Sequence, residues 1–209
     1  MIKYSIVMPA LNEENYIRTP LISLNKQLDS ETEIIVVDNE CSDKTAQIAK
    51  DYGARVIKAP RGKLNARHAG IMAAHGSVII ATDADTYYPP GWLQKIKEHF
   101  KRPEVVAVGG KRTYDRDMLR ARIAGLIRQR FFGGNSAFRK SAYVESGGFD
   151  LSVNQFSLWP MVKEEELGFK KRLKKHGKLV IDRSISVITS SRRYTDKDFK
   201  AQVKQGDRF

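Results

Sequence analysis

Hydrophobic and polar positions alternate in blocks along the first 110 residues of the chain. Short apolar runs predict strands at residues 4–8, 33–38, 54–59, 77–83 and 104–110. Segments with apolar residues at helical spacing predict helices at residues 13–28, 42–52, 63–75 and 90–100. Strands that alternate with single helices are typical of βαβ units. We therefore expect an α/β fold with a Rossmann-like, mostly parallel sheet and helices on both faces.

Residues at the helix ends refine this expectation. Pro20 is expected to disturb the middle of the first helix, because proline removes a backbone donor. Ser42 is expected to cap the second helix, and Pro90 lies near the first turn of the fourth.

The pattern changes after Gly110. A basic amphipathic helix is predicted at residues 116–132, a turn-rich segment at 133–150 and a second amphipathic helix at 164–177. Two late strands are expected at residues 178–182 and 184–190. No internal repeat or low-complexity linker separates the halves, so the chain is expected to form a single domain.

Composition narrows the class of protein. Hydrophobic residues make up 41% and charged residues 29% of the 209 residues, as in a soluble globular protein. No apolar run reaches the ~18–20 residues that cross a bilayer, and the first residues do not have the pattern of a signal peptide. Cys41 is the only cysteine, which excludes an intrachain disulfide and favours a cytoplasmic location.

The net charge of +13 suggests a polyanionic partner. Nucleic acid, a membrane surface and a phosphate-rich substrate all fit this charge. A surface rich in lysine and arginine is also common in proteins from hot environments, so charge alone does not choose a partner.

Segments rich in polar residues follow three of the predicted strands. Residue 8 leads into "PALNEE", residue 37 into "DNECSD" and residue 82 into "DAD". In open parallel sheets, ligands bind at the carboxyl ends of the strands. The three loops are therefore expected to line one crevice.

Asp83 and Asp85 are separated by one alanine at the end of an apolar strand. Carboxylates ~4–6 Å apart repel unless a positive charge lies between them. Mg²⁺ and Mn²⁺ bind such carboxylates together with phosphate oxygens of a substrate. A solvated turn is the alternative, and the position at a strand end favours a metal site.

These motifs, in this order and spacing, resemble family 2 glycosyltransferases of the GT-A fold. The resemblance rests on residues 9–13 (PALNE), 36–43 (VVDNECSD), 62–71 (GKLNARHAGI) and 83–85 (DAD). It covers residues 3–110 strongly and continues more thinly through "GGNSAFRKSAYVESGGFD" and "EELGFKKRLKKHG". It implies one catalytic domain over residues 1–209, with a nucleotide-sugar-binding half at 1–110. The acceptor-binding half and a basic tail, at 111–209, form a C-terminal extension on the acceptor side.

The resemblance also implies roles for individual residues. The nucleoside would be held by Pro9, Ala10, Leu11, Glu13 and Asp38. Asp83 and Ala84 would help position the nucleotide, and Asp85, with Asp83, would bind Mg²⁺ or Mn²⁺ on the diphosphate. The diphosphate could also be bound by basic side chains, namely Lys63, Arg67, Arg192 and Arg193. The alternative is that these residues belong to solvated basic surfaces.

A general base is expected near the start of the late amphipathic helix. The family has an aspartate there, and Glu166 stands in its place. The base is therefore assigned to Glu166 or Glu165, with Glu164 as a third choice. An acidic first turn that complements the helix dipole is the alternative. The reaction implied is a single displacement with inversion at the anomeric carbon.

Two departures from the family pattern affect specificity. Asn39 replaces a commoner aspartate, so a preference for uridine does not follow. His68 replaces the usual asparagine.

The acceptor is less defined by the sequence. Several relatives glycosylate polyprenyl phosphates, and the basic helix at 116–132 could lie on the inner surface of an anionic membrane or pack against the core. The acceptor could also be another glycan.

Three rival functions remain: a sugar-1-phosphate nucleotidyltransferase, a basic nucleic-acid-binding protein and a degenerate transferase. "PALNEE" lacks the nucleotidyltransferase glycines, and no nucleic-acid recognition motif appears.

Overall fold

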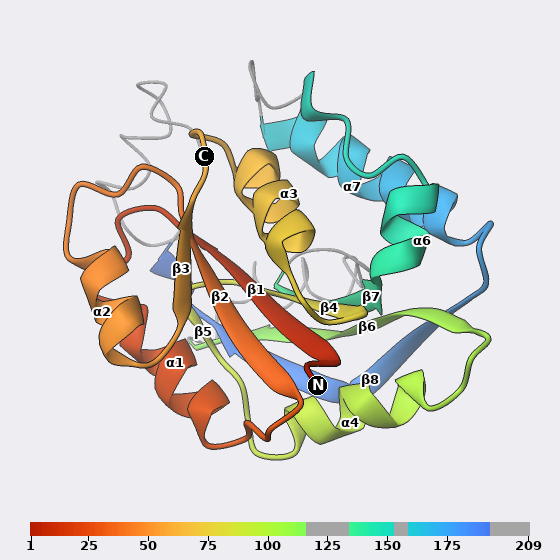
Figure 1. Cartoon of the computed structure of the whole chain (residues 1–209), viewed down its shortest axis with the longest axis horizontal. Helices are drawn as coiled ribbons and strands as arrows, with labels where there is room; N and C mark the ends of the chain where they lie inside the picture. The colour runs from red at the N-terminus through yellow and green to blue at the C-terminus, as the bar shows by residue number, and fades with distance from the viewer. Residues whose placement is uncertain (116–133, 153–158, 193–209) are drawn as a thin grey trace.

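The computed structural model describes residues 1–115, 134–152 and 159–192, and in 159–166 the only side chain described is that of Glu165. One sheet contains all the described strands, in the order β3-β2-β1-β4-β7-β6-β8-β5 (Figure 1). These strands are β1 (Tyr4–Ala10), β2 (Thr32–Asp38), β3 (Arg55–Lys58), β4 (Val78–Thr82), β5 (Thr86–Tyr87), β6 (Val105–Tyr114), β7 (Asn135–Arg139) and β8 (Lys178–Thr189). The described helices are α1 (Arg18–Asn25), α2 (Thr45–Asp51), α3 (Lys63–Ala73), α4 (Trp92–Phe100), α6 (Lys140–Glu145) and α7 (Trp159–Leu173).

The first half of the chain forms the predicted βαβ units. β1 pairs in parallel with both β2 and β4, and β2 pairs in parallel with β3. The second half is mixed, because β7 runs antiparallel to both β4 and β6. The carboxyl ends of β1, β2 and β4 therefore lie side by side, as expected for a ligand crevice.

Alternate residues of the central strands enter two separate cores. In β1, Ile6 and Met8 pack with α1, α2 and α4, whereas Val7 on the opposite face packs with α3, α6 and α7. Helices thus cover both faces of the sheet (Figure 1). On α3, a Cβ at Gly70 would lie 2.4 Å from Cγ1 of Val7, so glycine allows this helix to approach the sheet closely.

Several expectations about individual elements were wrong. The first helix begins only at Arg18, so Pro20 lies in its first turn, where the missing N–H has no intrahelical partner to lose. The second begins at Thr45, whose N–H donates to Asp43, and Ser42 does not cap it. The two late strands form one strand, β8, with a register shift opposite Gly109 and Lys111.

The segment predicted as turn-rich contains a strand and a short helix. β7 has the sequence NSAFR and lies between β4 and β6, with residues 135–138 buried. Its first two residues, Asn135 and Ser136, are short and polar and hide its strand character in the sequence. The amide of Asn135 donates to the carbonyls of Ile185 and Lys111 and accepts from Nε1 of Trp92. The helix predicted at 116–132 lies outside the described residues.

Candidate active site

The ends of β1, β2 and β4 surround a small cleft of about 20 Å³. It is lined by Pro9, Ala10, Leu11, Glu13, Asn39, Lys63, Asp83, Ala84 and Asp85. All of these except Asn39 were assigned to donor or metal binding from the sequence. The tertiary structure therefore brings together residues from loops that are more than 70 positions apart in the chain.

The loops after β1 and β2 hold each other in shape. The N–H of Glu13 donates to Oγ1 of Thr45 over 2.7 Å, and the N–H of Ser42 donates to the side chain of Asn12 over 2.9 Å. Asn12 has a positive φ of 53°, a conformation that asparagine tolerates better than most residues. Part of the polar character of these two motifs thus serves the loop structure.

Asp38 and Asn39 follow β2 with different partners. Oδ1 of Asp38 accepts the N–H of Cys41 over 2.8 Å. The side chain of Asn39, whose residue is 2% exposed, accepts the N–H of Gly62 just before α3 over 3.0 Å. A neutral side chain at position 39 makes this bond without burying another charge beside Asp83. Asn39 therefore ties the end of β2 to the residue before α3.

Asp83 is the electrostatic centre of the site. Its Oδ1 accepts Nη2 of Arg67 at 2.9 Å and lies 3.3 Å from Nζ of Lys63. Its Oδ2 accepts Nη2 of Arg112 and the N–H of Gly134, at 2.9 and 3.0 Å. Three cationic side chains thus share one buried carboxylate. The arrangement concentrates positive charge at the end of β4, where an anionic ligand would be stabilised.

The backbone of Asp83 is held by a buried tyrosine. The hydroxyl of Tyr88 accepts the N–H of Asp83 over 2.9 Å and lies within hydrogen-bond distance of the carbonyl of Gly134, at 3.2 Å. Burial raises the pKa of Tyr88, so this hydroxyl remains a donor at any physiological pH. Tyr88 therefore fixes the turn that carries Asp83 and Asp85 against the strand β7.

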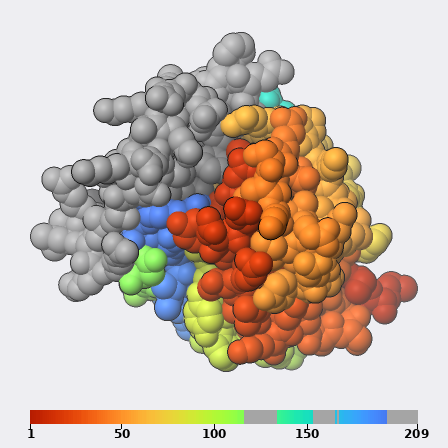
Figure 2. All heavy atoms as spheres, turned by 90° about the vertical axis from the view of Figure 1, so that its left-hand side faces the viewer, coloured from red at the N-terminus to blue at the C-terminus, as the bar shows by residue number. Residues whose placement is uncertain are grey.

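Asp85 lies near a cation from the end of β8. Its Oδ2 lies 3.4 Å from both Nε and Nη2 of Arg192, and Nη2 of Arg192 forms a short ion pair with Glu13. The guanidinium also lies over the ring of Tyr16, at 4.1 Å. Burial disfavours the charge of Arg192, but the carboxylates of Glu13 and Asp85 outweigh it and raise the pKa of this guanidinium. The first loop and the end of β8 lie side by side on one face (Figure 2).

Glu165 lies on the inner side of α7. Its Oε1 accepts Nη2 of Arg172 over 2.5 Å and the N–H of Asp150 over 2.8 Å, and its side chain is 8% exposed. Arg172 also donates to the carbonyl of Gly148. The carboxylate thus anchors the Gly-Gly-Phe-Asp turn to α7. The side chain of Glu166, like Arg193, lies outside the described residues.

Sequence analysis missed three residues around Asp83. Arg112 lies in β6, two residues beyond the predicted end of that strand, and a charged residue after an apolar run gave no sign of its partner. Tyr88 and Gly134 were also missed. The signal available for Tyr88 was its place five residues after Asp83 in "DADTYYPPG".

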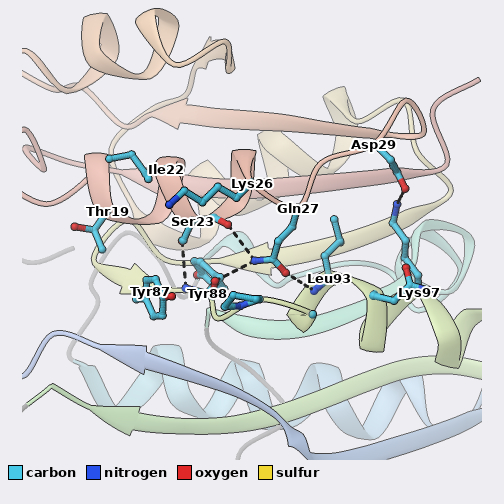
Figure 3. A pocket seen from close by; sticks show the side chains of 13 residues that line it. Thr19, Ile22, Ser23, Lys26, Gln27, Asp29, Tyr87, Tyr88, Leu93 and Lys97 are labelled. Atoms are coloured by element: carbon cyan, nitrogen blue, oxygen red, sulfur yellow. Dashed lines mark hydrogen bonds and ion pairs between the residues drawn. The ribbon is translucent and has the colours of Figure 1, made fainter.

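A larger cavity than this cleft lies between α1 and the start of α4, and has a volume of about 490 Å³ (Figure 3). None of the predicted site residues lines it. Its polar side chains bond to each other and to the backbone: Gln27 donates to the carbonyls of Ser23 and Tyr88, and Lys97 donates to Asp29. Of these two cavities, only the smaller cleft is lined by residues that the sequence analysis assigned to the site.

The match to a known family covers most of the chain. Residues 5–161 match the model of Glycosyl transferase family 2, and the chain belongs to this family. Its architecture is the GT-A fold. It is similar to S. aureus TarS, with a TM-score of 0.73 and 18% identity over 92% of this chain and 61% of that one. It is also similar to the mannosyltransferase PcManGT from Pyrobaculum calidifontis in complex with GDP-Man and Mn²⁺. That match has a TM-score of 0.68 and 18% identity over 89% of this chain and 56% of that one.

Among curated proteins, a dolichyl-phosphate hexose transferase from Haloferax volcanii is 36% identical over 92 residues, covering 44% of this chain and 40% of that protein. The chain spans less than half the length of the curated relatives it matches. Within residues 1–115, 134–152 and 159–192, no helix combines the length and apolar character needed to cross a membrane.

Proposed function

We propose that this protein transfers a sugar from a nucleotide diphosphate sugar to an acceptor. The observation that carries the proposal is the cleft at the ends of β1, β2 and β4, where acidic residues meet three cationic side chains. Family membership and the GDP-Man bound by PcManGT support a nucleotide-sugar donor.

In this proposal, the loops after β1 and β2 hold the nucleoside. Pro9, Ala10 and Leu11 form one wall of the cleft, and Asp38 at the end of β2 presents a carboxylate that accepts N–H groups. The carboxylate of Glu13 pairs with Arg192, so we assign Glu13 to positioning this arginine rather than to contact with the nucleoside.

The diphosphate is assigned to the cationic groups around Asp83. Lys63 lines the cleft at the start of α3 and is 3.3 Å from Asp83, so its ammonium group is within reach of a phosphate. Arg67 is 2% exposed, and we propose that it acts by holding Asp83 rather than by touching the donor. Arg192 and Arg193, after β8, remain proposed phosphate ligands.

The residues at Asp85 fit a divalent metal. This carboxylate already has a cation, Arg192, at 3.4 Å, so the position attracts positive charge. Asp85 would hold Mg²⁺ or Mn²⁺, with further ligands from the diphosphate oxygens. The ion would supply positive charge to the leaving diphosphate. Mn²⁺ in the PcManGT complex supports a metal of this kind. Asp83 has three cationic partners, so we assign it to organising the site rather than to direct coordination.

For the general base, we propose Glu166. The adjacent Glu165 is engaged by Arg172 and by the N–H of Asp150, which leaves it poorly placed to accept a proton from an acceptor. A base must lie within hydrogen-bond reach of the acceptor hydroxyl. Attack in a single displacement, on the face opposite the leaving diphosphate, would invert the anomeric carbon.

The acceptor is proposed as a hydroxyl or a lipid phosphate. The name of the Haloferax volcanii relative, a dolichyl-phosphate hexose transferase, supports a polyprenyl phosphate. Contact with a membrane through residues 116–132 is a hypothesis, which flotation with anionic and neutral liposomes would test. Equal failure to float with both would remove it.

The donor is tested by thermal unfolding with UDP-, GDP- and dTDP-sugars, each with and without Mn²⁺. Wild type and Asp85→Ala are run side by side, with Lys3→Ala as a control at an exposed ion pair far from the cleft. We expect a metal-dependent rise in melting temperature for one nucleotide, kept by Lys3→Ala and lost in Asp85→Ala. No shift with any nucleotide, combined with salt-dependent binding to DNA, would instead favour the nucleic-acid alternative.

A further inference from the structure

The cleft is narrow between the side chains that line it. Its volume of about 20 Å³ is close to the ~10–15 Å³ that a single water molecule needs. A nucleoside diphosphate is many times larger, so a side chain that spans the cleft would be displaced as a donor binds.

Arg192 joins two of the residues that line this cleft. It comes from the end of β8, forms an ion pair with Glu13 in the loop after β1, and lies 3.4 Å from Asp85 in the turn after β4. Packing over the ring of Tyr16 adds a third contact. Arg192 thus ties the two sides of the cleft together.

The charges explain why an arginine is stable there. The side chains of Glu13 and Asp85 are 5% and 6% exposed, and two poorly solvated carboxylates repel each other. Arg192 relieves this repulsion. Its contact with Glu13 is short, whereas its contacts with Asp85 are at the long limit of a hydrogen bond. The contact with Asp85 is therefore the one most easily given up.

We propose that Arg192 occupies the cation position beside Asp85 in the donor-free protein, and that metal and diphosphate displace it together. This inference rests on the proposed function. The described part of the chain contains no group of three or more His, Cys, Asp or Glu side chains that could hold a metal. A metal ion that binds alone would displace Arg192 but gain few protein ligands in return. When a diphosphate binds with the ion, its oxygens serve as further metal ligands and also give Arg192 a new anionic partner.

The test measures Mn²⁺ binding by the electron paramagnetic resonance signal of the free ion, first without nucleotide and then with UDP or GDP. Wild type is compared with Arg192→Ala and with Arg192→Gln, which keeps length and polarity but removes charge. Lys3→Ala makes the same change in charge at an exposed ion pair with Glu31, far from the cleft. Melting temperatures show that each variant is folded.

We expect both Arg192 variants to bind Mn²⁺ without nucleotide more tightly than wild type. The factor is about tenfold if the Arg192-bound form makes up about nine tenths of the molecules. In wild type, nucleotide should strengthen Mn²⁺ binding strongly, and in the variants this strengthening should shrink. Lys3→Ala should behave as wild type.

Unchanged or weaker Mn²⁺ affinity in both variants would overturn the inference. Tighter binding in Arg192→Ala but not in Arg192→Gln would also overturn it, because bulk rather than charge would then exclude the metal. If wild type binds a nucleotide with Mn²⁺ while the variants keep wild-type affinity for Mn²⁺ alone, only the role of Arg192 fails. If neither wild type nor any variant binds nucleotide with Mn²⁺, the proposed function fails as well.

Discussion

Nη2 of Arg67 donates to Oδ1 of Asp83 over 2.9 Å, and the Arg67 side chain is 2% exposed. This pair joins the middle of α3 to the end of β4, the two elements that carry the proposed phosphate and metal ligands. Because both groups are buried, each depends on the other for compensation of its charge.

Arg67→Met is expected to destabilise the protein. Removing one partner of a buried ion pair costs about 3–5 kcal/mol of unfolding free energy. Because Lys63 and Arg112 still compensate the charge of Asp83, we expect a loss near the lower end of this range. Denaturant unfolding measures the change. Arg55→Met removes an arginine that is 36% exposed and pairs with Glu33, so it should cost less. A larger loss of unfolding free energy in Arg55→Met would show that the buried pair of Arg67 and Asp83 does not contribute more to stability than the more exposed pair.

Glu165→Gln and Glu166→Gln should have opposite profiles. Glu165→Gln removes the charge that binds Arg172 at 2.5 Å, so it should lower the melting temperature. Glu166→Gln should leave the melting temperature near that of wild type and reduce the rate of sugar transfer by about 10²–10⁴-fold, the usual contribution of a general base. Both are measured on the donor found in the unfolding screen. A stable, inactive Glu165→Gln beside an active Glu166→Gln would reverse the assignment.

Stability should fall in acid partly through Asp29. The ammonium of Lys97 bonds to this carboxylate at 2.5 Å and lowers its pKa from the ordinary value of 3.8. A carboxyl whose pKa is lower in the folded state stabilises the fold above the unfolded value, and this contribution disappears as pH falls through the folded value. Asp29→Asn should therefore melt below wild type at pH 7, and the difference should shrink below about pH 4. A constant difference at every pH would exclude this linkage.

Gly70→Ala should loosen α3 from the sheet. The added Cβ would lie 2.4 Å from Cγ1 of Val7 and 2.8 Å from Cγ2 of Val37, two side chains of the buried core. Overpacking of this kind costs about 1–3 kcal/mol, which unfolding in urea would detect. Met72→Ala, on the same helix but 50% exposed, is the matched control and should change little. Equal effects of the two substitutions would contradict the close approach.

Much of the structure of residues 1–110 could be predicted, because the sequence patterns that indicate its strands and helices are local. An apolar run such as "EIIVVD" predicts a buried strand wherever it occurs, and a polar residue directly after it predicts a loop at the sheet edge. Parallel pairing then brings Pro9, Asp38 and Asp83 to one edge of the sheet. Their roles in binding stay predictions.

The described residues after 110 were harder to predict, because their structure depends on partners that are distant in the sequence. β7 begins with the short side chains of Asn135, Ser136 and Ala137 directly after two glycines, and it forms a strand because β4 and β6 provide hydrogen bonds on both sides. Glu165 also depends on a partner outside its local sequence. In "EEE" nothing distinguishes it from its neighbours, and only the folded α7 places its carboxylate against Arg172.

The order of the first strands and helices, and the residues at their ends, follow from the sequence, since both depend on hydrophobic periodicity within short windows. The ion-pair partners of the charged residues do not follow from the sequence. Arg112 and Arg192 are ordinary basic residues in the chain, and only the sheet brings one to Asp83 and the other to Asp85 and Glu13. Electrostatic pairing acts through space rather than along the chain, so it was the folded sheet that gave these arginines their place in the site.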